Sequence, residues 1–267
     1  QYYSTQSGQF SASRVFQVYE DRAGNEWILS DNGLGMLTAG QTTPTSYFVD
    51  AAEREKKGGQ AFYSCLEYNS EIYFGSDNGR VWCYQKENGQ FQLQNLPASS
   101  RIVSINSVEG NELIFTTAKD GFFSYQPKTK AIEHFPASRF PNASIHSVYV
   151  DKASEVWFEQ HIPGTVVHFN PRTRILKQEK VPVEPTSTDR SRPAFHIHED
   201  INGVLWVHPY GGGFSYFDRK SNSLHPFYNS LSGSDWRFSN KIHAAFSDRQ
   251  GDLWMCTHSK GLEKVTF

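Results

Sequence analysis

The chain has 267 residues, of which 15% are aromatic and only two are methionine, a balance typical of β-rich proteins. Its 26 basic and 28 acidic residues nearly cancel, so no net field draws it to nucleic acid or to an anionic membrane surface. The apolar runs are too short for a transmembrane helix, and the first residues lack the basic and apolar regions of a signal peptide.

A pattern of about 45 residues occurs six times along the chain. Each repeat contains a polar turn, an apolar triplet, a turn with glycine and an alternating segment. The triplets begin at Trp27, Ile72, Ile114, Trp157, Trp206 and Trp254. The glycines are Gly33, Gly79, Gly121, Gly164, Gly213 and Gly261. One further strand-like segment precedes each apolar triplet, and another follows the alternating segment of every repeat but the last. One repeat therefore predicts four short antiparallel strands, the unit of a β-propeller blade.

We therefore expect an all-β fold, a single β-propeller domain over residues 1–267. The expected four-stranded blades span about 14–48, 61–96, 101–135, 144–180, 194–228 and 241–267. The last repeat stops after three strands, while the start of the chain resembles residues 225–248. This predicts that residues 1–5 complete the sixth blade and close the ring, leaving no open edge. Alternatively, the chain is a piece of a longer array.

Several conspicuous residues have structural interpretations. The first apolar residue of each triplet is expected to pack between neighbouring sheets. Asp21, Asp151, Asp200 and Asp248 lie six residues before a Trp, where an Asp side chain can bond the turn backbone, so we do not take them as catalytic acids. Gly211, Gly212 and Gly213 precede a strand and no Lys-Ser or Lys-Thr pair, which favours a turn over a phosphate-binding loop.

No catalytic residue, metal or cofactor is predicted. Cys65, Cys83 and Cys256 form no CxxC motif and are expected to be small buried residues, with a Cys65–Cys83 bridge left open. His196 and His198 alternate on one strand, which suits two metal ligands, but the sequence places no third. A G-x-S-x-G motif is absent, and no cysteine has an obvious histidine partner.

The candidate ligand site follows from the topology of a propeller. Turns between second and third strands share a face with the blade-to-blade connections, and loops on a rigid scaffold commonly bind ligands. The candidate ligand-binding residues are His161, His208, Tyr210, Trp236, Arg237 and His258. Aromatic rings stack on sugar faces, while Arg and His donate to hydroxyls or carboxylates. Alternatively, the polar turn residues are solvated and Trp236 fills a gap between blades.

The repeats in EDINGVLWVHPYGGGFSYFD (199–218) and SDRQGDLWMCTHSKGLEKV (247–265) resemble the two-component regulator propeller repeat of bacterial hybrid two-component sensors. The resemblance extends over all six repeats and is weaker where Ile72 and Ile114 replace Trp. The chain departs from the family in having fewer repeats than usual and no kinase, membrane or DNA-binding segment, which suggests an excised domain.

The resemblance implies a periplasmic sensor domain of an inner-membrane histidine kinase receptor. Such a domain recognises an oligosaccharide and controls transcription of polysaccharide-utilisation genes. It implies a homodimer, no enzymatic activity in this domain, no nucleic acid bound by it, and membrane contact only through the parent protein. Two alternatives stay open. One is a propeller-fold carbohydrate lyase or hydrolase, and the other is a protein-binding scaffold.

Overall fold

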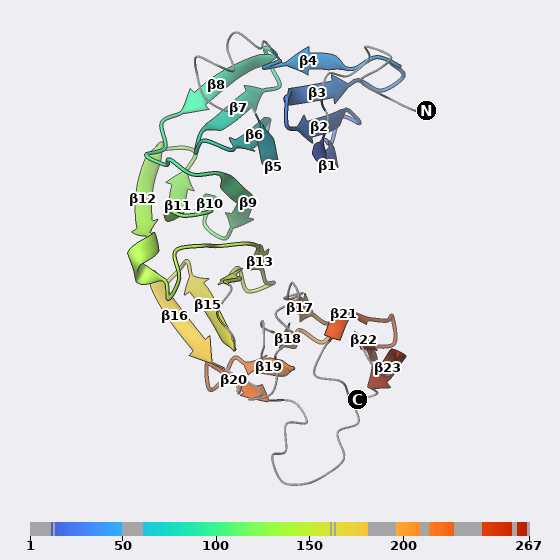
Figure 1. Ribbon diagram of the computed structural model, residues 1–267, viewed down its shortest axis with the longest axis vertical. Helices are drawn as coiled ribbons and strands as arrows, with labels where there is room; N and C mark the ends of the chain where they lie inside the picture. Colours follow the sequence, from blue (N-terminus) through green and yellow to red (C-terminus); the bar gives the residue numbers. More distant parts are fainter. Residues whose placement is uncertain are drawn as a thin grey trace. The chain divides into compact units, whose positions relative to one another are not determined.

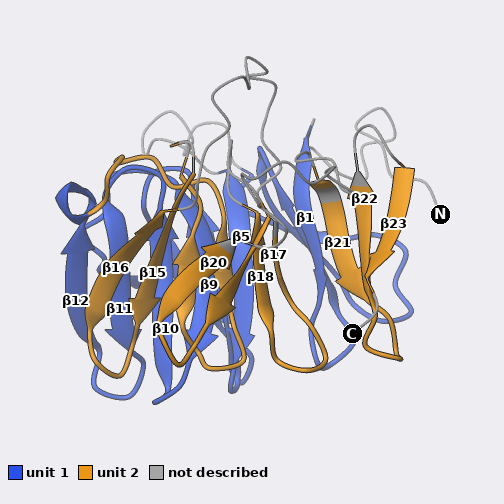
Figure 2. Ribbon diagram, turned by 90° about the horizontal axis from the view of Figure 1, so that it is seen from below, with its two compact units in different colours: residues 1–139 blue, residues 140–267 orange. Residues whose placement is uncertain are grey.

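The fold is built from β-strands, as predicted. The computed structural model describes residues 12, 14–49, 61–160, 162, 164–180, 196–208, 214–226, 242–257 and 261–265. Within these ranges the regular structure is strand, apart from one 3-10 turn, η2 (Ala137–Arg139). None of the described segments forms a helix able to cross a bilayer. The chain divides into two compact units, residues 1–139 and 140–267, which are described separately (Figure 2).

Unit 1 contains three sheets, each of four antiparallel strands in chain order (Figure 1). The first sheet comprises β1 (Val15–Glu20), β2 (Glu26–Ser30), β3 (Gly33–Leu37) and β4 (Thr45–Tyr47). The second comprises β5 (Phe62–Tyr68), β6 (Glu71–Ser76), β7 (Val81–Gln85) and β8 (Gln90–Gln94). The third comprises β9 (Ile102–Val108), β10 (Glu112–Thr117), β11 (Gly121–Gln126) and β12 (Ala131–Pro136). Each sheet has the topology of a propeller blade.

Unit 2 contains three further antiparallel sheets. The first comprises β13 (Val148–Val150), β14 (Val156–Phe158), β15 (Thr165–Asn170) and β16 (Ile175–Lys180). The second comprises β17 (His196–Glu199), β18 (Leu205–His208), β19 (Ser215–Asp218) and β20 (Ser223–Pro226). The third comprises β21 (Ile242–Ser247), β22 (Leu253–Thr257) and β23 (Gly261–Val265). Residues 1–5, the predicted fourth strand of this last sheet, lie outside the described residues. Ring closure and the number of blades therefore stay predictions.

The first apolar residues of the triplets lie in the core, as predicted, with one exception. The buried ones are Trp27, Ile72, Ile114, Trp157 and Trp206. In unit 1 the Trp27 ring lies 4.9 Å from the rings of both Phe74 and Tyr84 on the neighbouring sheet. Trp254 differs because its ring is only half-buried, parallel to that of its cross-strand neighbour Phe246.

The four repeated aspartates stabilise turns, and each also binds a tryptophan. The Oδ1 atom of each Asp accepts the backbone N–H groups two and four residues later. Their Oδ2 atoms accept the indole N–H in the pairs Asp21–Trp27 (3.1 Å), Asp151–Trp157 (3.0 Å), Asp200–Trp206 (2.9 Å) and Asp248–Trp254 (2.8 Å). The predicted structural role is confirmed. The repeats that have Ile72 and Ile114 in place of Trp also lack the Asp, because no indole needs an acceptor there.

In unit 1 the repeated glycine is required by both conformation and space, whereas nothing lies within 4 Å of the missing Cβ of Gly261 in unit 2. Gly33, Gly79 and Gly121 have φ values of 87°, 79° and 86°, which side chains rarely adopt. A Cβ at Gly33 would lie 2.3 Å from Tyr47 O, and one at Gly121 would lie 2.1 Å from Phe135 O. The second-to-third-strand turn can therefore lie against the backbone of the fourth strand only where it carries no side chain.

Candidate functional site

Each sheet of unit 1 has a leading end, which we define as the end where its first strand begins and its second-to-third-strand turn lies. Backbone N–H donors of the turns bond carbonyls just before the first strands, in the pairs Asp31–Arg14 (3.0 Å), Asp77–Ala61 (3.0 Å) and Ala118–Arg101 (2.8 Å). Buried hydroxyls close the same turns, since Ser30 donates to Gly33 O at 2.9 Å and Thr117 to Gly121 O at 2.8 Å. The leading ends are thus hydrogen-bonded scaffolds from which neighbouring side chains project.

One of the six predicted ligand-binding residues lies in the described part of the chain. That residue is His208; His161, Tyr210, Trp236, Arg237 and His258 lie outside the described residues. His208 ends β18, is 7% exposed, and has its ring 6.4 Å from that of Phe214. Its imidazole is therefore packed within unit 2 and not solvated, and its role in ligand binding stays a prediction. The grouping of all six around one mouth stays a prediction.

A β-bulge interrupts the first strand of every unit 1 sheet at its second residue. Phe16 is inserted between the pairs formed by Val15 and Gln17, and Tyr63 between those formed by Phe62 and Ser64. Val103 has the same place in β9. A bulge leaves one residue without a partner in the ladder and re-aims its side chain, which is why bulges commonly lie near functional sites.

Two of these bulge residues are aromatic, and they meet an arginine. The rings of Phe16 and Tyr63 stack with centroids 4.2 Å apart and planes at 26°. The guanidinium carbon of Arg101, the residue before β9, lies 4.8 Å from the Tyr63 ring centroid. Strand β5 lies against both β1 and β9, so the three side chains come from adjacent first strands. Phe16 is 37% exposed and Arg101 is exposed, so this aromatic–arginine cluster faces solvent.

The segment that carries Arg101 is fixed from two sides. Asp120 accepts the backbone N–H groups of Ser99 at 2.9 Å and Ser100 at 2.8 Å. Burial acts to raise the pKa of Asp120, but these hydrogen bonds outweigh it and hold the pKa below its usual value. Ile102, which follows Arg101, packs against Gly75. A Cβ at Gly75 would lie 2.6 Å from the Cβ of Ile102, so only a glycine permits β6 and β9 to approach this closely. The Arg101 backbone therefore has a defined position.

The sequence contained a signal for this cluster that was missed. Apolar doublets open the three first strands, at residues 15–16, 62–63 and 102–103, before the alternating pattern begins. Strict alternation would send the two members of a doublet to opposite faces, and the bulge is what accommodates them. The residues predicted to bind ligand lie in turns and connections, whereas those of the cluster lie at or just before the beginnings of strands.

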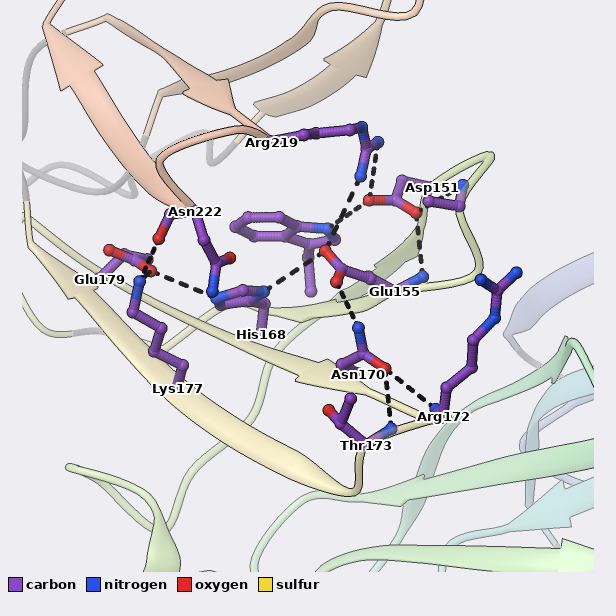
Figure 3. A network of polar contacts seen from close by, with 12 residues as sticks. Asp151, Glu155, His168, Asn170, Arg172, Thr173, Lys177, Glu179, Arg219 and Asn222 are labelled. Carbon is purple, nitrogen blue, oxygen red and sulfur yellow. Dashed lines mark hydrogen bonds and ion pairs between the residues drawn. The ribbon is translucent and has the colours of Figure 1, made fainter.

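Unit 2 contains a charged network centred on a buried histidine (Figure 3). His168 on β15 is 3% exposed, and its ring stacks on Trp157 with centroids 4.4 Å apart. Its Nδ1 lies 3.6 Å from Glu155 Oε2, and its Nε2 lies 3.3 Å from Glu179 Oε1. The neighbouring His168 imidazole, helped by Asn170, whose side-chain N–H donates to Glu155 Oε1 at 2.8 Å, outweighs burial and holds the pKa of Glu155 below its usual value. The imidazole therefore bridges two strands of its sheet.

Arg219 extends the network to the next sheet (Figure 3). Its Nη2 lies 3.1 Å from Asp151 Oδ2 and 3.5 Å from Glu199 Oε1, while its Nη1 lies 3.8 Å from Glu155 Oε2. The residues involved come from first-to-second and third-to-fourth-strand turns, at the end opposite the second-to-third-strand turns. Because one guanidinium contacts three carboxylates, the network links two sheets of unit 2.

The described residues contain no group of three or more His, Cys, Asp or Glu suited to a metal ion. His198 lies on β17 with its Nε2 2.8 Å from Ser247 Oγ on β21, which gives this histidine a role between sheets. All three cysteines are free, so the Cys65–Cys83 bridge that the sequence left open is not formed. Burial raises the pKa of the Cys65 and Cys83 thiols to about 12, which keeps both protonated near neutral pH.

Comparison with known proteins gives fold relatives only. No family profile and no curated protein matches the sequence. Among solved structures, the extracellular domain of a hybrid two-component system from B. thetaiotaomicron matches with a TM-score of 0.61 and 16% identity. That of a one-component system from the same organism has a TM-score of 0.55 and 16% identity. Streptogramin B lyase matches with a TM-score of 0.60 and 17% identity.

The chain shares the fold of these proteins. The two extracellular-domain matches each cover 97% of this chain but only 34% and 39% of the longer partner. The chain thus spans little more than a third of those domains. The lyase match covers 94% of this chain and 78% of the lyase. Because all identities are below 20%, the likeness extends to architecture and not to ligand or activity.

Proposed function

We propose that this chain is the ligand-sensing domain of an extracytoplasmic two-component receptor and that its ligand is an oligosaccharide. The observation that carries the proposal is the aromatic–arginine cluster. It presents two stacked rings and a guanidinium on adjacent strands of a hydrogen-bonded scaffold, in a fold shared with extracellular domains of two-component systems. Aromatic rings and arginine are the groups that bind sugar faces and their polar substituents.

The signalling role follows from how such a domain works when it is joined to a receptor. A ligand shifts a conformational or dimer equilibrium only by binding one arrangement more tightly than the other. We propose that oligosaccharide binding biases a homodimer of a periplasmic sensor anchored in the inner membrane. The receptor would carry a histidine kinase and control transcription of polysaccharide-utilisation genes. The domain itself would bind without cleaving.

A second candidate function is a carbohydrate lyase or hydrolase, since an enzyme, streptogramin B lyase, shares the fold. A third is a protein-binding scaffold. Isothermal calorimetry against a panel of neutral and acidic plant and host oligosaccharides, with chromatography of the recovered sugars, separates the three. Binding with unaltered sugars supports the sensor, shortened or unsaturated products support the enzyme, and silence across the panel contradicts glycan recognition.

A further inference from the structure

We infer that the aromatic–arginine cluster of Phe16, Tyr63 and Arg101 binds an acidic sugar, a pyranose that carries a carboxylate, within the recognised oligosaccharide. This inference rests on the proposed function and adds the chemical class of the ligand. None of these three residues is among the ligand-binding residues predicted from the sequence.

The surroundings of Arg101 favour an anionic ligand. Within the ranges that the structure describes, no carboxylate pairs with its guanidinium, whose partner is the face of Tyr63. Arg219 shows the opposite arrangement, since Asp151 and Glu199 both lie within 3.5 Å of its guanidinium. A guanidinium held against a ring keeps its fork of N–H donors for a carboxylate, which it binds with two parallel hydrogen bonds.

The two rings of the cluster, Phe16 and Tyr63, favour a sugar as the ligand. A single cation above a ring is not by itself a site. The guanidinium carbon of Arg139 lies 5.1 Å from the ring centroid of Phe135, but that ring is buried and offers no surface to a ligand. The cluster differs because Tyr63 also stacks on Phe16, which keeps 37% of its surface exposed. An apolar ring exposed beside an unpaired cation matches the C–H face and the carboxylate of an acidic pyranose.

The cluster is also built in advance of binding. The bulges at Phe16 and Tyr63 aim both rings, while Asp120 and the close approach at Gly75 fix the segment before β9. Because the backbone that carries these side chains is already fixed, less conformational entropy of the protein is lost when a ligand binds. Since the whole chain has a formal net charge of −2, attraction for an acidic sugar must come from local groups such as Arg101.

The test is calorimetry on the full 267-residue chain with two acidic probes, an oligogalacturonate and a hyaluronan hexasaccharide, which present two different uronates. The fully methyl-esterified oligogalacturonate is the neutral control, and a poly-glutamate peptide tests for an acidic protein segment. We expect one acidic sugar to bind at least about tenfold more tightly than the ester and the peptide, as charge-assisted hydrogen bonds allow.

Two substitutions divide the effect between charge and stacking. Arg101→Gln is expected to weaken the acidic sugar at least about tenfold and to leave any binding of the ester within about twofold. Phe16→Ala is expected to weaken both about three- to tenfold through lost stacking. Arg139→Gln removes a matched exposed arginine, and Ile132→Ala a side chain that is also 37% exposed; both are expected to bind as wild type.

Each outcome is decisive for the inference. Acidic-sugar binding that falls in R101Q and F16A but not in the controls supports it. Binding of neutral panel sugars without acidic ones, or acidic binding that R101Q leaves unchanged, overturns it and leaves the proposed sensor intact. Tighter binding of poly-glutamate identifies a protein ligand and overturns it too. If no sugar binds, both the inference and the proposed function fail.

Discussion

Glu155 shows how one carboxylate couples pH to the stability of unit 2. The neighbouring His168 imidazole and a hydrogen bond from Asn170 hold its pKa in the folded protein below the ordinary value of 4.5, which approximates that in the unfolded chain. The folded state is therefore favoured above the unfolded pKa, and that stabilisation is lost as pH falls through 4.5 towards the folded value. A group with a raised pKa would show the opposite dependence.

We predict that Glu155→Gln flattens the acid limb of the stability curve. Urea unfolding between about pH 7 and about pH 4 should show a smaller loss of unfolding free energy for E155Q than for wild type, because the glutamine cannot be protonated. Glu87→Gln, on an exposed turn, should follow the wild-type curve. An acid limb for E155Q as steep as that of wild type would show that other carboxylates dominate the acid response.

At the scale of elements, the second-to-third-strand turns are set by glycine. Gly121 and Gly110 share a φ of 86°, but only Gly121 has backbone atoms near its missing Cβ, the closest being Phe135 O at 2.1 Å. Nothing lies within 4 Å of that position at Gly110. Substituting Gly110 and Gly121 in turn therefore separates the cost of the backbone conformation from the cost of steric overlap, within one unit.

We predict that Gly110→Ala costs about 1–2 kcal/mol of unfolding free energy, from left-handed strain alone. Gly121→Ala should cost at least about 2 kcal/mol more, because the turn or the fourth strand must also move. Chemical unfolding monitored by circular dichroism measures both. Equal losses for the two variants would mean that β12 shifts easily and that close approach does not define the turn.

These elements also show what could be predicted from sequence. The apolar anchor and the glycine recur six or seven residues apart because each sheet has the same packing requirement, so the roles of Trp27 and Gly33 could be predicted from the repeat. The bulges at Phe16 and Tyr63 depend on ladder register, which a doublet of apolar residues indicates only weakly. His168 lay in an ordinary strand pattern, and its two carboxylates, Glu155 just before β14 and Glu179 on β16, are brought together by folding.

For the whole molecule, arginines of the described residues differ in the partners that they bind. In unit 2, Arg219 is committed to carboxylates that join two sheets, whereas in unit 1 Arg101 at a leading end lacks such a partner. With a net charge of −2, the chain as a whole does not steer acidic ligands. Recognition must therefore depend on local geometry, and its sensitivity to salt should be modest.

Ring closure is the remaining question at this scale. In the described residues β23 (Gly261–Val265) pairs with β22, and residues 1–5 are predicted from sequence to add the fourth strand. If they do, backbone N–H groups of β23 that face away from β22 are hydrogen-bonded, and deleting residues 1–5 should speed their hydrogen exchange at least about tenfold. Exchange along β11 (Gly121–Gln126), inside a four-stranded sheet, serves as the control and should not change. Unchanged exchange along β23 would instead favour the longer array, in which residues 1–5 belong to another blade.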